Sequence, residues 1–141
     1  MIKLTFQGAA AYDYTAEPDA GKISVPLEIQ GVATTAVLDT ATPYFICPPK
    51  IAAQAGFSGK LGTLVLRTHR GTFKGQCFRG RVRLQATEGK EIEFEATVFV
   101  PEEQTWNVSF LGFHCCLERI RFAVDPRKDK EMFYFADAGA D

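Results

Sequence analysis

The chain has no long apolar run and almost no net charge. Its 141 residues carry 16 basic and 17 acidic side chains, a net charge of −1, so no global field favours a nucleic acid or an anionic membrane. Its apolar runs are much shorter than the roughly 20 residues that span a bilayer. It has no internal repeat and no low-complexity segment. We therefore expect one globular domain with no nucleic-acid and no membrane partner.

The sequence also lacks a leader pattern and a regular metal-binding spacing. The opening residues 1–6 are too few and too polar for a secretory signal peptide, so we expect a cytoplasmic protein. In that compartment thiols stay reduced. We expect this of all four cysteines: Cys47, Cys77, Cys115 and Cys116. They form no Cys-x-x-Cys pair, and His69 and His114 add no zinc pattern, so we predict no metal and no cofactor.

What the chain does contain is an apolar core with strand-like alternation. It is 46% hydrophobic with 12 phenylalanines. Alternation predicts a hairpin of Ile23–Ile29 and Val32–Leu38 around Gln30-Gly31. Proline at the start and glycine at the end predict a short helix at residues 48–56, and residues 113–120 are long enough for another. Further strands are predicted at Leu64–Leu66, Arg81–Leu84, Ile92–Val98, Arg121–Val124 and Met132–Phe135. The expected fold class is all-β with one or two short helices.

Two predicted strands share a charged face. A three-residue loop at Thr87–Gly89, with its glycine in the left-handed conformation, pairs Arg83 with Glu93 and Arg81 with Glu95. A two-residue loop would mix the polar and apolar faces. The arginines are thus expected on a solvated, charge-paired surface.

The N-terminal segment differs in composition from the rest. We predict a possible strand at Lys3–Phe6, followed by a linker-like stretch at Gly8–Gly21 that is rich in alanine, glycine and aspartate. The expected organisation is an N-terminal strand and linker at 1–21 and a folded domain at 22–141.

The most informative stretch is Leu38-Asp39-Thr40, where an apolar run ends in a carboxylate. Burying a charge is costly unless it is paired or shares a proton. By itself, Asp39 is better explained as a turn carboxylate that accepts backbone hydrogen bonds. The other aspartates do not stand in an apolar-run-then-Asp-Thr pattern, and Asp125 before Pro126 is typical of a turn.

Two blocks resemble the retropepsin-type aspartic proteases. In that family a hairpin leads into a hydrophobic-hydrophobic-Asp-Thr/Ser-Gly turn, as in residues 23–40 here. Phe110-Leu111-Gly112 is similar to the family's hydrophobic-hydrophobic-Gly element beside the catalytic turn, and residues 117–126 resemble the tail of cellular members. The resemblance covers about residues 22–135. This chain departs from it at Ala41, where the family has glycine, and at Phe113-His114, where it often has Arg-Asn or Arg-Asp.

The resemblance implies a retropepsin-like fold and peptide-bond hydrolysis by an aspartic endopeptidase. With one Asp-Thr motif, it implies a homodimer in which Asp39 of each subunit forms the catalytic dyad and Thr40 bonds across the axis. The terminal strands Lys3–Phe6 and Met132–Phe135 are then candidates for the interface. The partners would be a second copy and a peptide or protein substrate.

A glycine-containing hairpin at residues 68–75 lies where the family's flap would lie. With the catalytic turn it implies four substrate contacts: Ala41, Arg70, Gly71 and Thr72. Leu111 and Gly112 would support the site structurally.

Two other functions fit the sequence. A non-catalytic dimerisation or peptide-binding module could retain this fold, with Ala41 marking the loss of chemistry. A thiol or metal regulator would use Cys115 and Cys116 and would carry zinc.

Overall fold

The protein is a β-structure in which two sheets surround a common core. The structure is a computed structural model that describes residues 5–15, 22–68, 71–127 and 131–138. Its elements are β1 (Gly8–Ala11), β2 (Asp13–Thr15), β3 (Lys22–Ile29), β4 (Val32–Leu38), β5 (Phe45–Ile46), α1 (Pro49–Ala55), β6 (Lys60–Thr68), β7 (Gly71–Leu84), β8 (Glu88–Gly89), β9 (Ile92–Pro101), β10 (Ser109–Leu111), the 3-10 helix η1 (Leu117–Arg119), β11 (Ile120–Asp125) and β12 (Met132–Asp137). The prediction of an all-β fold is confirmed. Within these described ranges no helix has the length and apolar character needed to cross a membrane.

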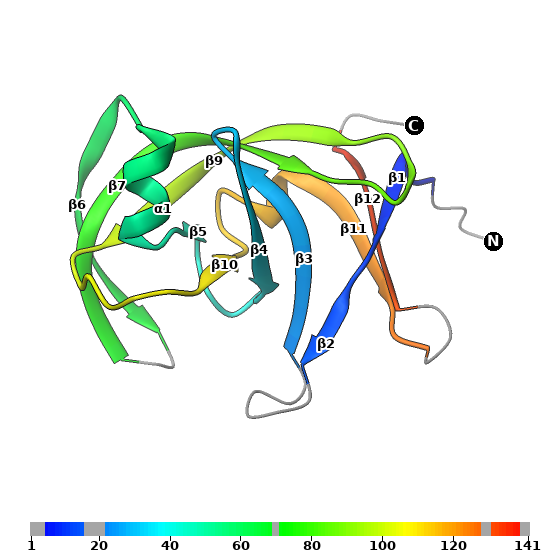
Figure 1. The fold of residues 1–141 in the computed structure, drawn as a ribbon, viewed down its shortest axis with the longest axis horizontal. Coiled ribbons are helices and arrows are strands. Elements are labelled where there is room, and N and C mark those ends of the chain that lie inside the picture. Colours follow the sequence, from blue (N-terminus) through cyan, green and yellow to red (C-terminus); the bar gives the residue numbers. More distant parts are fainter. Residues whose placement is uncertain (1–4, 16–21, 69–70, 128–130, 139–141) are drawn as a thin grey trace.

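The larger sheet closes on itself. Its strand order is β2-β3-β4-β10-β5-β9-β7-β6, and an additional pairing of β3 with β7 closes the ring from β3 to β7. A smaller sheet, β11-β12-β1-β8, stands on one side of the molecule, opposite α1 and β6 (Figure 1). The main core lies between them and buries Leu27, Val82, Leu111, Phe133 and Phe135.

Local sequence signals account for the first hairpin and the helix. β3 pairs with β4 through Ile29 opposite Val32, and Gln30 and Gly31 between them both have positive φ, as a tight two-residue turn requires. Helix α1 begins with proline and ends at Gly56, whose left-handed conformation lets its N–H bond to Ala52 O at 3.0 Å. Both predictions are confirmed.

The charged face follows the predicted register, with shifted ion pairs. Arg83 lies opposite Glu93 and Arg81 opposite Glu95. Within this pair of strands the ion pairs are diagonal, however: Arg79 reaches Glu95 at 3.1 Å and Arg81 reaches Glu93 at 3.4 Å. The twist of a sheet brings diagonal neighbours together in this way. Arg83 instead binds Glu28, which lies directly opposite it on β3, at 2.5 Å.

The connection from β7 to β9 is longer than the predicted three-residue loop. It spans residues 85–91, because Glu88 and Gly89 form β8 and pair with β1. Gly89 has the expected left-handed backbone, with φ of 78°.

The N-terminal stretch that composition indicated as a linker contains two strands. Of the predicted strand Lys3–Phe6, Lys3 and Leu4 lie outside the described residues, and Thr5 and Phe6 are not in a strand. β1 instead begins at Gly8, where a Cβ would stand 2.1 Å from Lys90 O, and it buries Ala9 and Ala10. The small side chains therefore permit close strand packing.

The C-terminal strands are confirmed, and the predicted helix before them is not. Residues 113–120 contain only the single 3-10 turn η1, because Cys115 has a positive φ of 54° that interrupts an α-helix. β12 lies between β1 and β11 with both edges paired. Met132–Phe135 therefore has no open strand edge in this chain, and its place in a dimer interface stays a prediction. The edge strands of this sheet are β11 and β8.

Candidate active site

Strand β4 carries Asp39 to a turn that a second strand holds in place. β10 pairs in parallel with β4, placing Phe110 opposite Val37 and Leu111 opposite Leu38. Asp39 N donates to Leu111 O at 3.1 Å, and Thr42 N donates to Asp39 O at 3.2 Å. The two predicted blocks, far apart in sequence, are thus neighbours in space.

Each oxygen of the Asp39 carboxylate accepts one hydrogen bond. Ala41 N donates to Oδ1 at 3.0 Å, and Thr42 Oγ1 donates to Oδ2 at 2.8 Å. The carboxylate is half-buried, and Thr42 is only 3% exposed. These donors orient the carboxylate and leave acceptor capacity on both oxygens for a water or a second carboxyl group.

Thr42 is a site residue that the sequence analysis missed. The signal was present, because a threonine three positions after an aspartate can bond back to it within a turn.

Thr40 and Ala41, the next two residues of the turn, are exposed. Among the described residues, the non-glycine positions with positive φ are Gln30, Tyr44, Cys115 and Glu131. Ala41 therefore has an ordinary backbone conformation, and its methyl group fits within this chain without backbone strain.

Position 112 has no room for a side chain and requires glycine. A Cβ there would lie 2.0 Å from Tyr44 O and 2.4 Å from Thr42 O. This close approach lets Phe113 N donate to Thr42 O at 2.7 Å and Tyr44 N donate to His114 O at 3.0 Å. The structure thus brings Leu111 and Gly112, both predicted as structural support, directly against the Asp39 turn.

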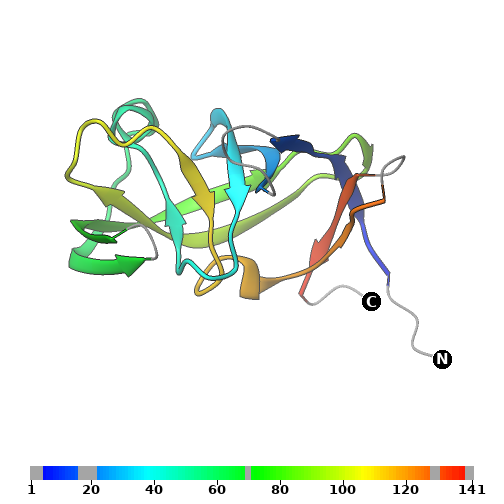
Figure 2. The ribbon, with the colours of Figure 1, turned by 90° about the horizontal axis from the view of Figure 1, so that it is seen from below.

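The predicted flap is a hairpin whose arm packs on the strand beside the turn. Thr68 pairs with Gly71 at the ends of β6 and β7, and Gly71 and Thr72 are exposed. Arg70 and His69 lie outside the described residues. In Figure 2 the end of β6, the Asp39 turn and η1 face the same, lower side of the molecule.

An aromatic chain connects this hairpin to β10. Phe73 meets Trp106 edge-on with ring centroids 4.7 Å apart, and Trp106 contacts Phe110 at 6.0 Å. A pocket of about 330 Å³ opens beside these rings, lined by Phe73, Glu103, Thr105, Trp106, Asn107 and Val108. Such a pocket can hold an apolar side chain.

The cysteines are free thiols, as predicted. Burial raises the pKa of Cys47 to about 12 and that of Cys116 to about 12, and burial also raises the pKa of Cys77. A protonated thiol is a poor nucleophile. These three residues are therefore not activated for catalysis.

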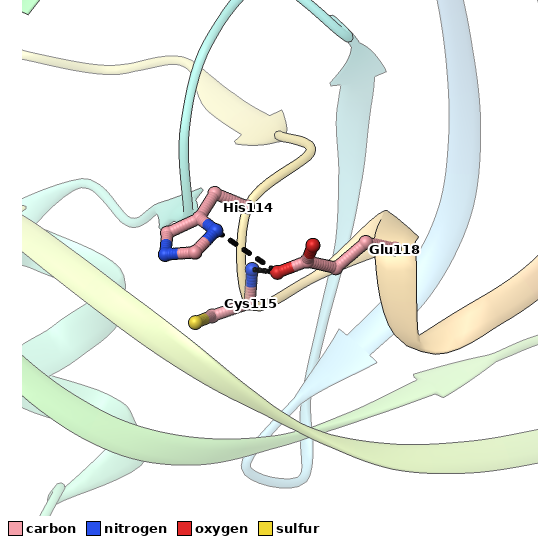
Figure 3. A group of neighbouring side chains, drawn as sticks. All are labelled: His114, Cys115 and Glu118. Carbon is pink, nitrogen blue, oxygen red and sulfur yellow. Dashed lines mark hydrogen bonds and ion pairs between the residues drawn. The ribbon is translucent and has the colours of Figure 1, made fainter.

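Cys115 differs from the other cysteines because it is partly exposed beside polar groups. His114 Nδ1 lies 3.0 Å from Glu118 Oε1, and Cys115 N donates to the same oxygen at 2.5 Å. Figure 3 shows His114 and Cys115 on the loop that leads into η1 and Glu118 on η1 itself. The sequence analysis considered the histidine and the cysteines here but not Glu118.

The other described aspartates lie away from the Asp39 turn. Asp13 is in β2, separated from β4 by β3. Asp125 binds Arg127 at 2.7 Å in the turn before β12, as expected of a turn aspartate, and Asp137 ends β12 opposite Ile120. Asp19, Asp129 and Asp141 lie outside the described residues.

Comparison with known proteins identifies the fold. No protein-family model and no curated protein matches the sequence. Among solved structures, the chain is similar to one described as the crystal structure of a retropepsin-like aspartic protease from Rickettsia conorii, with a TM-score of 0.55 and 19% identity. The match covers 96% of this chain and 95% of that one. The protein therefore has a retropepsin-like fold.

Proposed function

We propose that this protein is an aspartic endopeptidase that hydrolyses peptide bonds as a homodimer. The observation that carries the proposal is Asp39, held at the end of β4 by donors to both carboxylate oxygens, next to exposed Thr40 and Ala41. The retropepsin-like fold and the name of its structural neighbour support this chemistry.

The chemistry requires a second carboxylate, which we assign to Asp39 of another copy. Within the described part of the chain, no other aspartate stands at this turn. Two carboxylates held close together cannot both ionise easily, so they share one proton. The ionised member takes a proton from water as that water attacks the scissile carbonyl, and the protonated member donates to the carbonyl oxygen.

The proposed dimer axis passes beside the Asp39 turn. Thr40 and Ala41 are exposed there, and Phe113, whose N–H bonds to Thr42 O, has 42% of its surface exposed. An apolar ring beside a polar turn fits burial against a second copy. Thr40 would then bond across the axis, and β11 offers the nearest strand edge after η1.

The proposed substrate is an extended peptide between the Asp39 turn and the β6–β7 hairpin. Backbone groups of Gly71 and Thr72, with Arg70, would contact it on the hairpin side, and Ala41 on the turn side. The pocket beside Phe73 and Trp106 would receive an apolar side chain. The cytoplasm is the compartment that we expect for this activity.

The test is a digest of a mixed peptide library, comparing wild-type protein with Asp39→Asn. The digest should run between about pH 4 and 7, where a carboxylate dyad can hold a single proton. We expect the wild type alone to cleave, with Thr35→Val as an active control on the exposed face of β4. Absence of cleavage by a wild type shown to be dimeric would refute the proposal and favour a peptide-binding module.

A further inference from the structure

Three side chains of types that bind metal ions lie together, and Asp39 is not among them. The side chains are His114, Cys115 and Glu118, and each offers one donor atom: an imidazole nitrogen, a thiolate sulfur and a carboxylate oxygen. All three donors lie within 4.8 Å of one another. The proteolytic function proposed above does not use these side chains.

We infer that these residues form a binding site for a divalent transition metal, with Zn²⁺ as the best fit. Zinc combines nitrogen, sulfur and oxygen ligands, whereas magnesium and calcium take oxygen almost exclusively. Neutral imidazole, thiolate and carboxylate together carry a charge that balances Zn²⁺. The site takes up a free ion from solution.

The geometry needs only a small adjustment. A tetrahedral zinc with bonds of about 2.0 to 2.3 Å places neighbouring donors about 3.3 to 3.6 Å apart. The His114–Glu118 separation of 3.0 Å is already close to this, and the other donor separations, all within 4.8 Å, would shorten by rotation of the exposed side chains. Three protein ligands leave one position of the tetrahedron for water.

The surroundings favour entry of an ion and fix two of the ligands. His114 and Glu118 are exposed and Cys115 is partly exposed, so no buried charge has to be uncovered. The His114 ring packs against Tyr44, with ring centroids 5.7 Å apart. The positive φ of Cys115 and the bond from its N–H to Glu118 hold the backbone between the ligands. Binding exchanges the protons of the thiol and of any charged imidazole for the metal, and these protons go to solvent.

The site is coupled to the Asp39 turn through the backbone. His114 O accepts from Tyr44 N, and the adjacent Phe113 N donates to Thr42 O, whose residue also holds Asp39 Oδ2. A metal on His114 and Cys115 would therefore fix the segment that supports the turn. We expect zinc to raise the thermal unfolding midpoint, because it binds the folded chain in preference to the unfolded one.

The test is metal binding by the full chain after chelator treatment, by calorimetric titration with Zn²⁺ and by absorption spectroscopy with Co²⁺. Cobalt bound to a thiolate gives a sulfur charge-transfer band. We expect one micromolar or tighter site per chain, with affinity reduced about tenfold or more in Cys115→Ser and in Glu118→Gln. Cys77→Ser and Glu102→Gln are the matched controls, and both should bind like the wild type.

Two outcomes would overturn the inference. One is a wild-type protein that takes up no zinc or binds it only in the millimolar range. The other is a Cys115→Ser protein with wild-type affinity and an unchanged cobalt spectrum. Because the readout is metal binding in folded protein, neither outcome depends on whether the chain cleaves peptides.

Discussion

The hydrogen bond from Thr42 to Asp39 is open to a quantitative test by Thr42→Val. Valine keeps the shape of threonine and removes the hydroxyl that donates to Asp39 Oδ2 at 2.8 Å. A hydrogen bond to a charged group contributes about 1.5 to 3 kcal/mol, and Thr42 is 3% exposed, so water cannot easily replace the donor. For a domain of this size, that loss corresponds to a fall of roughly 5 to 10 °C in Tm.

The assay is denaturant unfolding of Thr42→Val, Asp39→Ala and the double variant, at one fixed protein concentration because a dimer's stability depends on concentration. We expect a coupling energy of about 1.5 to 3 kcal/mol between the two positions. Thr35→Val, the same replacement on an exposed part of β4, should change stability by less than about 0.5 kcal/mol. Effects that add to within about 0.5 kcal/mol in the double variant would refute the bond.

Three further predictions concern the support of the site. Gly112→Ala should lower the free energy of unfolding by more than about 3 kcal/mol, because its Cβ would lie 2.0 Å from Tyr44 O, and a wild-type urea midpoint would contradict this packing. Phe73→Leu removes the contact between two aromatic rings and should lower the free energy of unfolding by about 0.5 to 1.5 kcal/mol. It should also shift the fluorescence emission of Trp106, the single tryptophan, to longer wavelength. An unchanged spectrum would place Phe73 away from that ring. In alkylation at about pH 8, followed by mass spectrometry, Cys115 should react in the folded protein, while Cys47 and Cys116 should react only after unfolding. Burial raises the pKa of Cys47 and of Cys116 to about 12 and keeps both thiols protonated. Equal alkylation rates for the three cysteines would contradict this.

Local patterns in the sequence were sufficient for the elements that local rules control. Alternation and the Gln30-Gly31 pair located β3 and β4, and the proline and glycine at its ends located α1. The register of β7 and β9 followed from keeping charged and apolar residues on separate faces. The proximity of Asp39 and Leu111 was predicted only through the resemblance to retropepsins, because no local rule links positions so distant in the chain.

The features that the sequence did not disclose depend on tertiary contacts. Gly8, Ala9 and Ala10 have linker-like composition, but they form a strand because a backbone approaches too closely for larger side chains. The burial of β12 between two strands depends on β1, which was not expected as a strand. Glu118 is a candidate ligand because the turn around Cys115 places its carboxylate beside His114, and the sequence pattern does not indicate this contact.

If two copies of Asp39 form one active site, mixing active and inactive subunits should reveal it. Wild-type and Asp39→Asn chains are unfolded, mixed in varied proportions and refolded together at constant total concentration, and peptide cleavage is then measured. We expect activity that falls with the square of the wild-type fraction, because a working site needs Asp39 from both chains. Activity that falls in simple proportion to the wild-type fraction would contradict the shared dyad and place a complete active site within one chain.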